Sequence, residues 1–450
     1  MRFARVRGPI PGPRSLEWFE QEQAYIAPGI QSIALYARLA IARGEGAIVE
    51  DVDGNRFIDF FTGVGVAILG HAHPKWVRAV QEQAARIAVG SFTTQARAEL
   101  VRLLSEIAPG DIRRAQFYSS GAEAVEAALR LAKSYTKKRE FLGFWGGFHG
   151  KTGGVLGLLG DPFKHELGPL MPGTYLTPYA DCYHCALGQT FPDCQFACVE
   201  FLRQKVLTET TNDLAAIVVE PIQGTAGNVV PPPGYLQRLQ ACAREFGALL
   251  ICDETITGFG RTGKMFACEH DGVVPDVIVI GKGFGGGFPI TGLLIREEVA
   301  HARPFADPSG SSSSFGGNPL AVAAALATVR VVLEEDLVSH AARMGRFMLD
   351  RLAVFPERYP FVGRVQGRGL MIGIELVADR WTRAPLDRRW TRMIFEECLR
   401  RGLIAMVYQP NMRLYPPLTV TEAIAEEGIA ILQEAFDAVA DRILAEAPGG

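Results

Sequence analysis

Lys282 lies between an apolar run and a glycine-rich turn in the sequence IVIGKGFGGG, residues 278–287. A β-strand that ends in a lysine buries most of the alkyl stem and desolvates the ammonium. This lowers the pKa of the amine and makes it a nucleophile toward an aldehyde. An arginine could not do this, because a guanidinium stays protonated and forms no imine. A solvated lysine at a strand end is the more common case, so the interpretation depends on what surrounds Lys282.

Two carboxylates precede Lys282, each at the end of an apolar run. The runs are DLAAIVVEPIQ (213–223) and GALLICDE (247–254), and apolar residues recur at helical spacing between them. This pattern predicts a strand, a helix and a strand. Runs that are apolar throughout suit a parallel sheet covered on both faces, whose loops at the carboxyl ends hold ligands. We therefore expect Glu220, Asp253 and Lys282 to meet at one edge of a sheet.

A carboxylate such as Asp253 needs a positive partner to be worth burying, and no arginine is adjacent in the sequence. The protonated ring nitrogen of pyridoxal phosphate would serve, and the same cofactor offers an aldehyde for Lys282. Its phosphate needs a cradle, and QFYSSGAEA (116–124) predicts a strand, a small-residue turn and a helix. The first amides of that helix, its dipole and the hydroxyls of Ser119 and Ser120 form an anion site. Taken alone, Ser-Gly before a helix is more often an ordinary N-cap.

Taken together, the ordered motifs of this chain resemble the class III, or ω-amino acid, aminotransferases, which are fold-type I pyridoxal-phosphate enzymes. The resemblance covers nearly the whole chain, and so many motifs in one order are very specific. The motifs are VDGNRFIDF (52–60), GHAHP (70–74), SGAEA (120–124), FHG (148–150), EPIQG (220–224), DE (253–254), GFGRTG (258–263), GK (281–282), GGNP (316–319) and Arg413.

The resemblance implies a set of residues at the cofactor. Lys282 looks like the lysine that carries the cofactor, and Asp253 like the partner of its ring nitrogen. Phe148 would stack on the ring, and the backbone of Gly121 and Ala122 would hold the phosphate. The other residues expected there are Ser120, His149, Glu220, Ile256 and Ser314. Ser314 would come from the other subunit of a homodimer or dimer of dimers with shared active sites, where the family usually has threonine.

The resemblance also implies residues that bind substrate. Arg413, in NMRLYPP (411–417), matches the arginine that binds the α-carboxylate of the substrate. Lys151 replaces a frequent arginine and could meet a distal carboxylate as a point charge rather than a fork. Val64 and Thr225 complete this set.

Two positions depart from the pattern of the family. The 4-aminobutyrate and ornithine enzymes have a glutamate where this chain has Thr225, and that glutamate pairs with the carboxylate-binding arginine when the donor lacks an α-carboxylate. Without it, Arg413 stays available in both half-reactions or pairs with another group, because a buried unpaired cation is costly. Ile256 stands where the family has a glutamine near the phenolic oxygen of the cofactor, so that hydrogen bond is lost.

The activity that the resemblance implies is a ping-pong transamination from an amino acid or ω-amine donor to a 2-oxo acid. Lys282 would act as the base that moves the proton of the substrate carbon. The alternative is a racemase, epimerase or aminomutase, because the same lysine can return its proton to carbon. A catalytically idle cofactor-binding or scaffold protein is a third reading, which the retention of both Lys282 and Asp253 disfavours.

We expect an α/β fold of the fold-type I kind in two domains. A large domain, residues 64–335, would hold a mostly parallel sheet flanked by helices. Residues 1–63 and 336–450 would pack together as a smaller α+β domain.

Length and composition agree with an enzyme of this kind. The chain has 450 residues, of which 48% are hydrophobic, so it can bury a large core. A net charge of -3 gives no general attraction to nucleic acid or acidic membranes. No apolar stretch approaches the roughly 20 residues of a transmembrane helix, and the start lacks the apolar core of a signal peptide. We expect a cytoplasmic protein that binds neither nucleic acid nor membrane.

Four cysteines crowd into one apparent loop and take no part in this chemistry. Cys182, Cys185, Cys194 and Cys198 form a C-x2-C pair and a C-x3-C pair separated by eight residues. This spacing could bind zinc or an iron-sulfur cluster. Reduced thiols that pack a subdomain, or disulfides, are the other open interpretations, and of the three we favour plain thiols first and metal or a cluster second.

Overall fold

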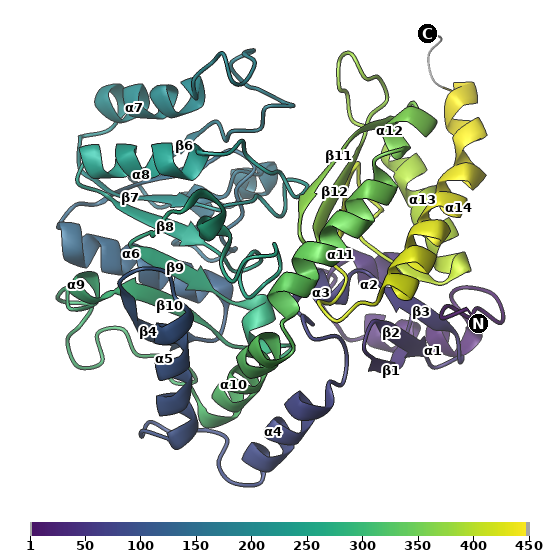
Figure 1. Ribbon diagram of the computed structural model, residues 1–450, viewed down its shortest axis with the longest axis horizontal. Helices are drawn as coiled ribbons and strands as arrows, with labels where there is room; N and C mark the ends of the chain where they lie inside the picture. The colour runs from purple at the N-terminus through teal and green to yellow at the C-terminus, as the bar shows by residue number, and fades with distance from the viewer. Residues whose placement is uncertain (1, 447–450) are drawn as a thin grey trace. The chain divides into compact units, whose positions relative to one another are not determined.

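The structure is a computed structural model that describes residues 2–446. The chain divides into two compact units, Lys75–Ser339 and Met1–Pro74 with His340–Gly450 (Figure 1). The first unit contains the expected lysine, aspartate and glutamate, and the second contains both ends of the chain.

The unit Lys75–Ser339 is built on a seven-stranded mixed sheet. The strand order is β4-β10-β9-β8-β7-β5-β6. β10 is antiparallel to both of its neighbours, and the other pairs are parallel. The strands are β4 (Ile112–Tyr118), β5 (Glu140–Phe144), β6 (Thr174–Thr177), β7 (Leu214–Val219), β8 (Leu249–Asp253), β9 (Val277–Ile280) and β10 (Thr291–Arg296). The α/β fold with a mostly parallel sheet is therefore confirmed.

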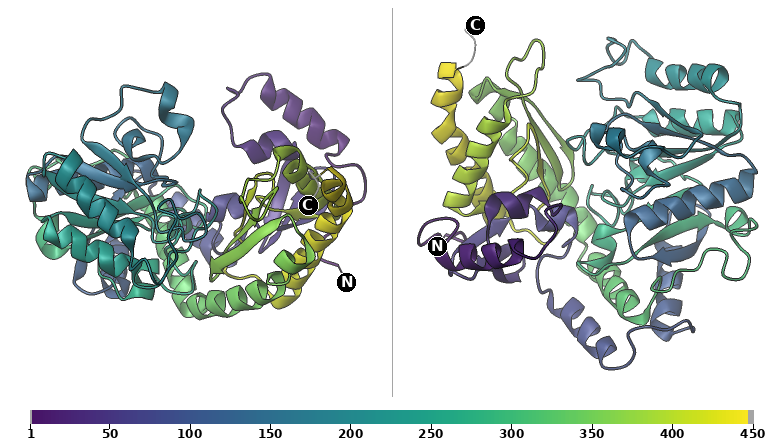
Figure 2. Two further views of the ribbon diagram at one scale, coloured as in Figure 1. Left: turned by 90° about the horizontal axis from the view of Figure 1, so that it is seen from above. Right: turned by 180° about the vertical axis from the view of Figure 1, so that it is seen from behind.

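Helices cover both faces of this sheet (Figures 1 and 2). They are α5 (Gln95–Ile107), α6 (Gly121–Thr136), α7 (Ala197–Glu209), α8 (Tyr235–Glu245) and α9 (Glu297–Ala300). α10 (Pro319–Glu334) packs against α5, and α4 (Pro74–Ala84) has no buried residue and lies away from the sheet in Figure 1. Four 3-10 helices occupy loops: η1 (Leu156–Leu158), η2 (Pro162–Glu166), η3 (Ala267–Asp271) and η4 (Lys282–Gly285).

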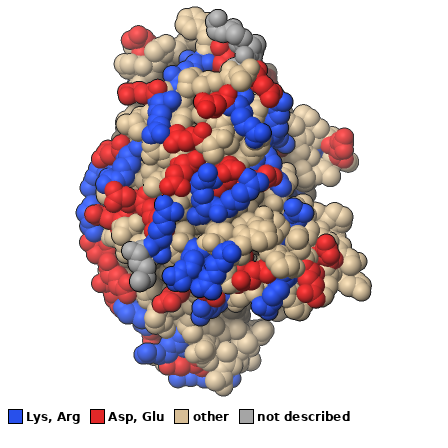
Figure 3. Space-filling view, turned by 90° about the vertical axis from the view of Figure 1, so that its right-hand side faces the viewer, with Lys and Arg blue, Asp and Glu red and all other residues tan. Residues whose placement is uncertain are grey.

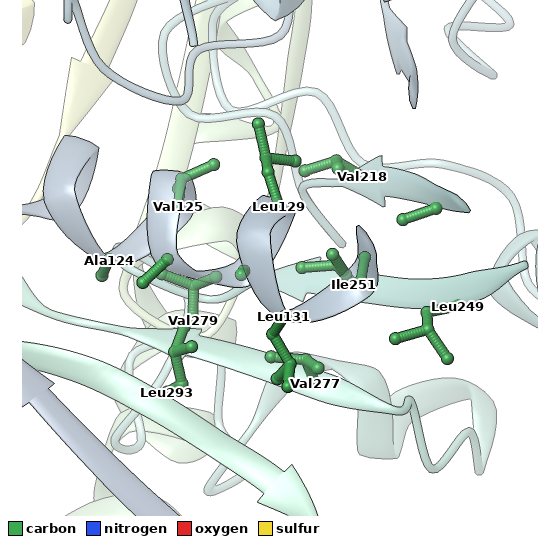
Figure 4. Packing of buried hydrophobic residues seen from close by; sticks show 14 of the residues in the cluster. Ala124, Val125, Leu129, Leu131, Val218, Leu249, Ile251, Val277, Val279 and Leu293 are labelled. Atoms are coloured by element: carbon green, nitrogen blue, oxygen red, sulfur yellow. The ribbon is translucent and has the colours of Figure 1, made fainter. Parts of the chain in front are cut away.

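The core of the sheet explains why β7, β8 and β9 are apolar along their whole length. Val218, Ile251 and Val279 point to the face covered by α6, where Leu129 packs against them (Figure 4). Successive side chains of a strand alternate between the two faces, so the residues between these three point to the other face. Those residues are buried as well. The prediction of strand, helix and strand from continuous apolar runs is confirmed by β7, α8 and β8.

The second unit contains two small sheets. One has the order β1-β2-β3-β13 and the other the order β11-β12-β14. The strands are β1 (Ile41–Glu45), β2 (Ile48–Asp51), β3 (Arg56–Asp59), β11 (Val362–Arg368), β12 (Met371–Leu376), β13 (Leu403–Ile404) and β14 (Asn411–Leu414). The helices are α1 (Pro13–Gln23), α2 (Ser32–Ala37), α3 (Thr62–Gly65), α11 (Leu337–Leu352), α12 (Phe355–Arg358), α13 (Arg388–Arg401) and α14 (Glu422–Glu446).

Segments from the two ends of the chain pair directly in this unit. β13 runs parallel to β3, with Leu403 opposite Ile58 and Ile404 opposite Asp59. Phe57, Ile58 and Leu403 are buried, and because Phe57 and Ile58 are consecutive, this sheet has apolar side chains on both faces. β13 adds a strand from the C-terminal segment to three strands from the N-terminal segment, so the start and the end of the chain fold as one unit.

Charged side chains of both signs are mixed on the face drawn in Figure 3. Lys and Arg side chains alternate there with Asp and Glu side chains, without a large area of one sign. Within residues 2–446, no helix combines the length and the apolar character needed to cross a bilayer.

Candidate functional site

The expected lysine and aspartate follow neighbouring parallel strands. Asp253 is the last residue of β8 and lies opposite Val279 of β9. Lys282 follows the end of β9 and begins η4. Its backbone is left-handed, with φ of 43°, which is uncommon and strained for a residue with a side chain. The chain therefore turns sharply at Lys282, and the residue is only half-buried.

Asp253 is held by a buried histidine. Nδ1 of His149 and Oδ2 of Asp253 lie 2.8 Å apart, and their side chains are 1% and 5% exposed. The other carboxylate oxygen accepts the backbone N–H of Thr255 at 3.1 Å. Burial raises the pKa of Asp253, but the hydrogen bond and charge of His149 outweigh it, so this pKa lies below its ordinary value. Burial lowers the pKa of His149, but Asp253 outweighs it and raises this pKa.

Glu220, which follows β7, is also buried, but its hydrogen-bond donors are backbone N–H groups. Its carboxylate accepts the backbone N–H of Phe148 at 2.8 Å and that of Gly224 at 2.9 Å. Burial raises the pKa of Glu220 above its ordinary value, and His149 opposes this effect. Glu220 thus connects the loop that contains Phe148 to the turn that contains Gly224.

The expected phosphate cradle lies at the start of α6. Ser120 is the N-cap, and its Oγ accepts the N–H of Glu123 at 3.2 Å. Gly150 has φ of 117°, and a Cβ there would lie 2.4 Å from Cβ of Ala122. Only glycine lets this loop approach the first turn of the helix so closely. The structure thus brings the Phe148 loop, Gly121 and Ala122 together.

Thr255 is a residue of this site that the sequence reasoning missed. A Cβ on Gly121 would lie 3.6 Å from Cγ2 of Thr255, and a Cβ on Gly281 would lie 3.0 Å from the same atom. Thr255 therefore lies between the first turn of α6 and the residue that precedes Lys282. Its position directly after Asp253-Glu254 was the available signal, because a residue two positions beyond a strand-end carboxylate stays near that strand end.

Thr291 also escaped the sequence reasoning. It is the first residue of β10, and its Oγ1 donates to the backbone carbonyl of Ser120 at 2.9 Å. This bond fixes the turn that leads into α6. In the sequence, Thr291 is one threonine at the start of an apolar run, and nothing distinguishes it.

Phe148 and Lys151 lie on one loop. Phe148 is half-buried and Lys151 is exposed. Nζ of Lys151 lies 6.0 Å from the centroid of the Phe148 ring and 4.8 Å from that of the Phe163 ring, which are cation–π distances. The backbone of this loop is fixed from the side of β7, because Nε2 of Gln223 donates to the carbonyl of Trp145 at 2.9 Å.

The two departures from the family pattern are neighbours in the structure. Ile256 is buried, and a Cβ on Gly224 would lie 3.2 Å from its Cγ2. Thr225, the next residue of that turn, is exposed. Ile256 thus places an apolar side chain where the family has the amide of a glutamine. Thr225 places a small hydroxyl where related enzymes have the carboxylate of a glutamate.

Ser314 lies in a loop that runs beside the edge strand β4. Ser311 of the same loop is buried, hydrogen-bonds Tyr118 through its hydroxyl and accepts Nε2 of Gln116 at 2.9 Å through its carbonyl. Ser314 itself is exposed. The loop is therefore fixed while its end is accessible, and the role of Ser314 across a subunit interface stays a prediction.

Val64 and Arg413 belong to the other unit, where they lie on connected segments. Arg413 is a buried residue of β14, opposite Gly373 of β12. Val64 lies in the turn Thr62–Gly65 with φ of 63°, which is strained for a β-branched residue. Oγ1 of Thr62 donates to the carbonyl of Tyr415 at 2.7 Å, which joins this turn to the end of β14.

Cys182, Cys185 and Cys194 lie between β6 and α7, and Cys198 lies in the first turn of α7. No disulfide joins any of the eight cysteines of the chain. Within the described part of the chain, no three His, Cys, Asp or Glu side chains are arranged around one point as metal ligands. The disulfide interpretation is therefore not seen, and the segment is considered further below.

Comparison with known proteins gives the class of this enzyme. The model of the family described as "Aminotransferase class-III" matches residues 32–436. The chain therefore belongs to the class III aminotransferases.

Among curated relatives, an acetylornithine aminotransferase from Methanopyrus kandleri is 39% identical over 403 residues, which cover 89% of this chain and 95% of the relative. A leucine/methionine racemase from Thermococcus litoralis is 36% identical over 408 residues, which cover 89% and 91%. A solved amine transaminase from an uncultivated Pseudomonas species, in its pyridoxal-phosphate-bound form, has a TM-score of 0.86 and 32% identity, with 92% and 98% coverage.

The predicted family, fold type and cofactor are thus confirmed. The chain is a pyridoxal-phosphate-dependent aminotransferase that moves an amino group from an amino donor to a 2-oxo acid. The residues present fit this cofactor. Asp253, Glu220 and His149 carry a net negative charge when all three are ionised, which suits a protonated ring nitrogen. The first turn of α6, closely bordered by Gly150, suits a phosphate.

Proposed function

We propose that Lys282 and Asp253 are the catalytic residues of this aminotransferase, and that it prefers amino acids with an α-carboxylate as donors. One observation carries the catalytic part. Asp253 is buried and bonded to His149 at the end of β8, beside the strand that leads into Lys282. A buried carboxylate with a lowered pKa stays ionised and can hold a proton on a basic group placed against it.

The other cofactor contacts follow from the geometry around this pair. Ser120, Gly121 and Ala122 would bind the phosphate through the start of α6, and Phe148 would pack on the ring. His149 and Glu220 would not touch the reacting atoms. His149 would hold Asp253 in place, and Glu220 would hold the loop of Phe148. Ile256 would contact the cofactor as an apolar surface.

The chemistry divides between the cofactor and the chain. Pyridoxal phosphate, when bound, supplies an aldehyde that carries the amino group and a ring that accepts electrons from the substrate carbon. Lys282 would hold the cofactor covalently at rest. Once the donor amine has taken its place, Nζ of Lys282 would remove the proton from the amino-bearing carbon of the substrate. Asp253 would keep its negative charge against the ring nitrogen throughout.

The donor preference rests on Thr225. This turn residue is exposed, adjoins Ile256 through Gly224 and brings no carboxylate to the site. A donor with its own α-carboxylate therefore gains binding energy from the charge of Arg413. A simple amine has no such carboxylate, and Thr225 supplies no carboxylate in its place. Lys151 would bind a distal carboxylate of the donor or acceptor, and Val64 would line the space for the substrate side chain.

The test of this proposal uses the cofactor-loaded enzyme and a panel of amine donors without an acceptor. A transferase converts its bound cofactor to the amine form and stops, which is seen as the loss of visible absorbance. We expect α-amino acids to cause this change faster than ω-amines of the same length. If no donor causes it, the enzyme does not work by amino-group transfer.

A racemase, epimerase or aminomutase is the second candidate, and the similarity to a leucine/methionine racemase favours it. The same base would return the proton to the opposite face of the substrate carbon or to another carbon. Incubation with a single L-amino acid and chiral chromatography distinguish the two. Accumulation of the D-enantiomer with no loss of visible absorbance would favour the racemase.

We further propose that the enzyme acts in the cytoplasm as a homodimer, or a dimer of dimers, in which Ser314 of each subunit completes the partner's phosphate site. The exposed position of Ser314 on a fixed loop supports the shared site. The free cysteines are consistent with a reducing compartment. The cofactor domain would be residues 64–335, and residues 1–63 and 336–450 would form the smaller domain.

A further inference from the structure

A long connection without regular structure joins β6 to α7. It begins after Thr177 and ends before Ala197, and its residues form turns and bends only. Connections of this length are uncommon in compact domains unless they have a function or something else holds them. A segment with a small apolar core of its own is commonly fixed by disulfides or by a metal ion.

The four thiols of this segment face one cavity. Cys182, Cys185, Cys194 and Cys198 all line one small pocket that is open to solvent. Aromatic rings form other parts of its wall, among them that of Phe196. None of the four is in a disulfide, so each is a thiol, the kind of ligand that suits a soft cation.

The backbone after Cys185 forms a tight turn. The N–H of Gly188 donates to the carbonyl of Cys185 at 3.0 Å, and the N–H of Gln189 donates to Sγ of Cys185 at 3.4 Å. Gly188 has φ of 64°, which this turn requires. A backbone N–H that donates to a cysteine sulfur can keep this bond when the sulfur binds a metal ion.

The second pair leads into a helix. The carbonyl of Cys194 accepts the N–H of Ala197 at 2.9 Å, and Cys198 lies in the first turn of α7. Asp181 and Asp193 add acidic groups to this segment, and His184 is exposed.

We propose that Cys182, Cys185, Cys194 and Cys198 bind one Zn²⁺ ion that fastens the segment between β6 and α7. Each S–H bond breaks, its proton passes to solvent, a sulfur–zinc bond forms and no electrons are transferred. Four thiolates in a C-x2-C and C-x3-C arrangement match the closed tetrahedral sites of structural zinc. The sulfur atoms are not yet arranged around one point within residues 2–446, so the ion would draw them inward by rotation about χ1.

The first experiment measures metal in the full-length holoenzyme. The protein is incubated with zinc, dialysed against metal-free buffer and analysed by inductively coupled plasma mass spectrometry. We expect one zinc ion per chain. The variants Cys185→Ser and Cys194→Ser each remove one ligand from one pair and should lose most of this zinc. Cys398→Ala, which changes a buried cysteine of α13 outside the segment, should retain it.

A second measurement on the wild-type protein covers the case in which the serine variants fail to fold. Cobalt replaces zinc, and thiolate ligands give an intense charge-transfer absorbance that water or carboxylate ligands do not give. Thiols are counted in denaturant with and without a chelator. One zinc ion per chain, thiolate-to-cobalt absorbance and four thiols protected by the metal would agree with the proposal. A chain that takes up no zinc, binds iron instead, or contains disulfides in this segment would overturn it.

Discussion

The ends of β7 and β8 present two buried carboxylates on adjacent strands, and they are stabilised in opposite ways. Asp253 is paired with an imidazole that can carry a positive charge, and its pKa is lowered. Glu220 is bonded to two backbone N–H groups, and burial raises its pKa. The charged partner of Asp253 keeps this carboxylate ionised. The backbone N–H groups that donate to Glu220 belong to two loops, so this carboxylate connects them. The comparison therefore separates the carboxylate that we propose to be catalytic, Asp253, from the one that we propose to be structural, Glu220.

The largest effect is expected at Lys282, which follows the end of β9. Lys282→Ala removes the amine, and because both covalent attachment and proton transfer depend on it, kcat should fall by more than about ten-thousandfold. The matched control is Lys264→Ala, which changes an exposed lysine outside this strand end. The measurement is steady-state turnover with saturating cofactor. Normal turnover of Lys282→Ala would show that another residue is the base.

The next prediction compares the two carboxylates directly. Asp253→Asn removes a charge that, at about 4 Å and an effective dielectric near 20, contributes on the order of 4 kcal/mol, which as an upper estimate is roughly a thousandfold in rate. Glu220→Gln leaves one buried N–H without its acceptor and should cost about 1 to 3 kcal/mol of stability, with a change in kcat below about tenfold.

Both variants are measured for turnover and for thermal unfolding. A change below about tenfold for Asp253→Asn would show that Asp253 does not face the ring nitrogen. A large loss of kcat in a stable Glu220→Gln protein would give Glu220 a role in the chemistry and would remove the contrast between the two strand ends.

The ion pair of Asp253 with His149 predicts a pH window. The lowered pKa of Asp253 makes its stabilising contribution present above about pH 4, and this contribution is lost as the pH falls through the lowered value. The raised pKa of His149 makes its contribution complete below about pH 6.5, and this contribution is lost as the pH rises through the raised value. The pair should stabilise most between these two limits.

The variant His149→Asn measures that window in the cofactor-free enzyme. It leaves Asp253 buried without its charged partner and should cost about 3 kcal/mol where the pair is fully ionised. The difference in Tm between wild type and variant should be largest near pH 5 to 6 and should shrink toward pH 9. A difference that is constant across this range would mean that His149 is neutral and acts only by packing.

The smallest effect concerns the turn that Glu220 holds. Thr225→Glu places a carboxylate beside Gly224, where it can replace the α-carboxylate that an ω-amine lacks. The ratio of kcat/KM for an α-amino acid to that for an ω-amine should fall about tenfold, which corresponds to about 1.4 kcal/mol. Thr225→Gln has the same shape without the charge and should leave the ratio near that of the wild type. A wild-type enzyme that already prefers a plain amine would contradict the proposed specificity.

Much of the large unit could be predicted from the sequence, because β7 and β8 are apolar on both faces and end in carboxylates. Few folds bury both faces of such strands and place the carboxylates at one edge of the sheet. The pairing of His149 with Asp253 could not be predicted, because the two residues are far apart in the sequence and His149 lies in a loop without periodicity. For the same reason, the hydrogen bond from the N–H of Phe148 to Glu220 required the structure.

The cysteine segment shows a different limit of sequence reasoning. The spacing of Cys182 to Cys198 left thiols, metal and disulfides open, because the same spacing suits all three. The structure shows free thiols around one cavity but does not arrange them as ligands. In our proposal an ion from outside the chain fixes this region, whereas hydrogen bonds within the chain fix the ends of β7 and β8.

The most direct test of the central claim is to locate the covalent attachment of the cofactor. The holoenzyme is treated with borohydride, which fixes a reducible link between an amine and an aldehyde, and is then digested and examined by mass spectrometry. We predict the added mass of the reduced cofactor on Lys282, with none on Lys151 or Lys264. Attachment to any other lysine, or the absence of attachment in a holoenzyme that transaminates, would contradict the assignment of Lys282 and the site built around it.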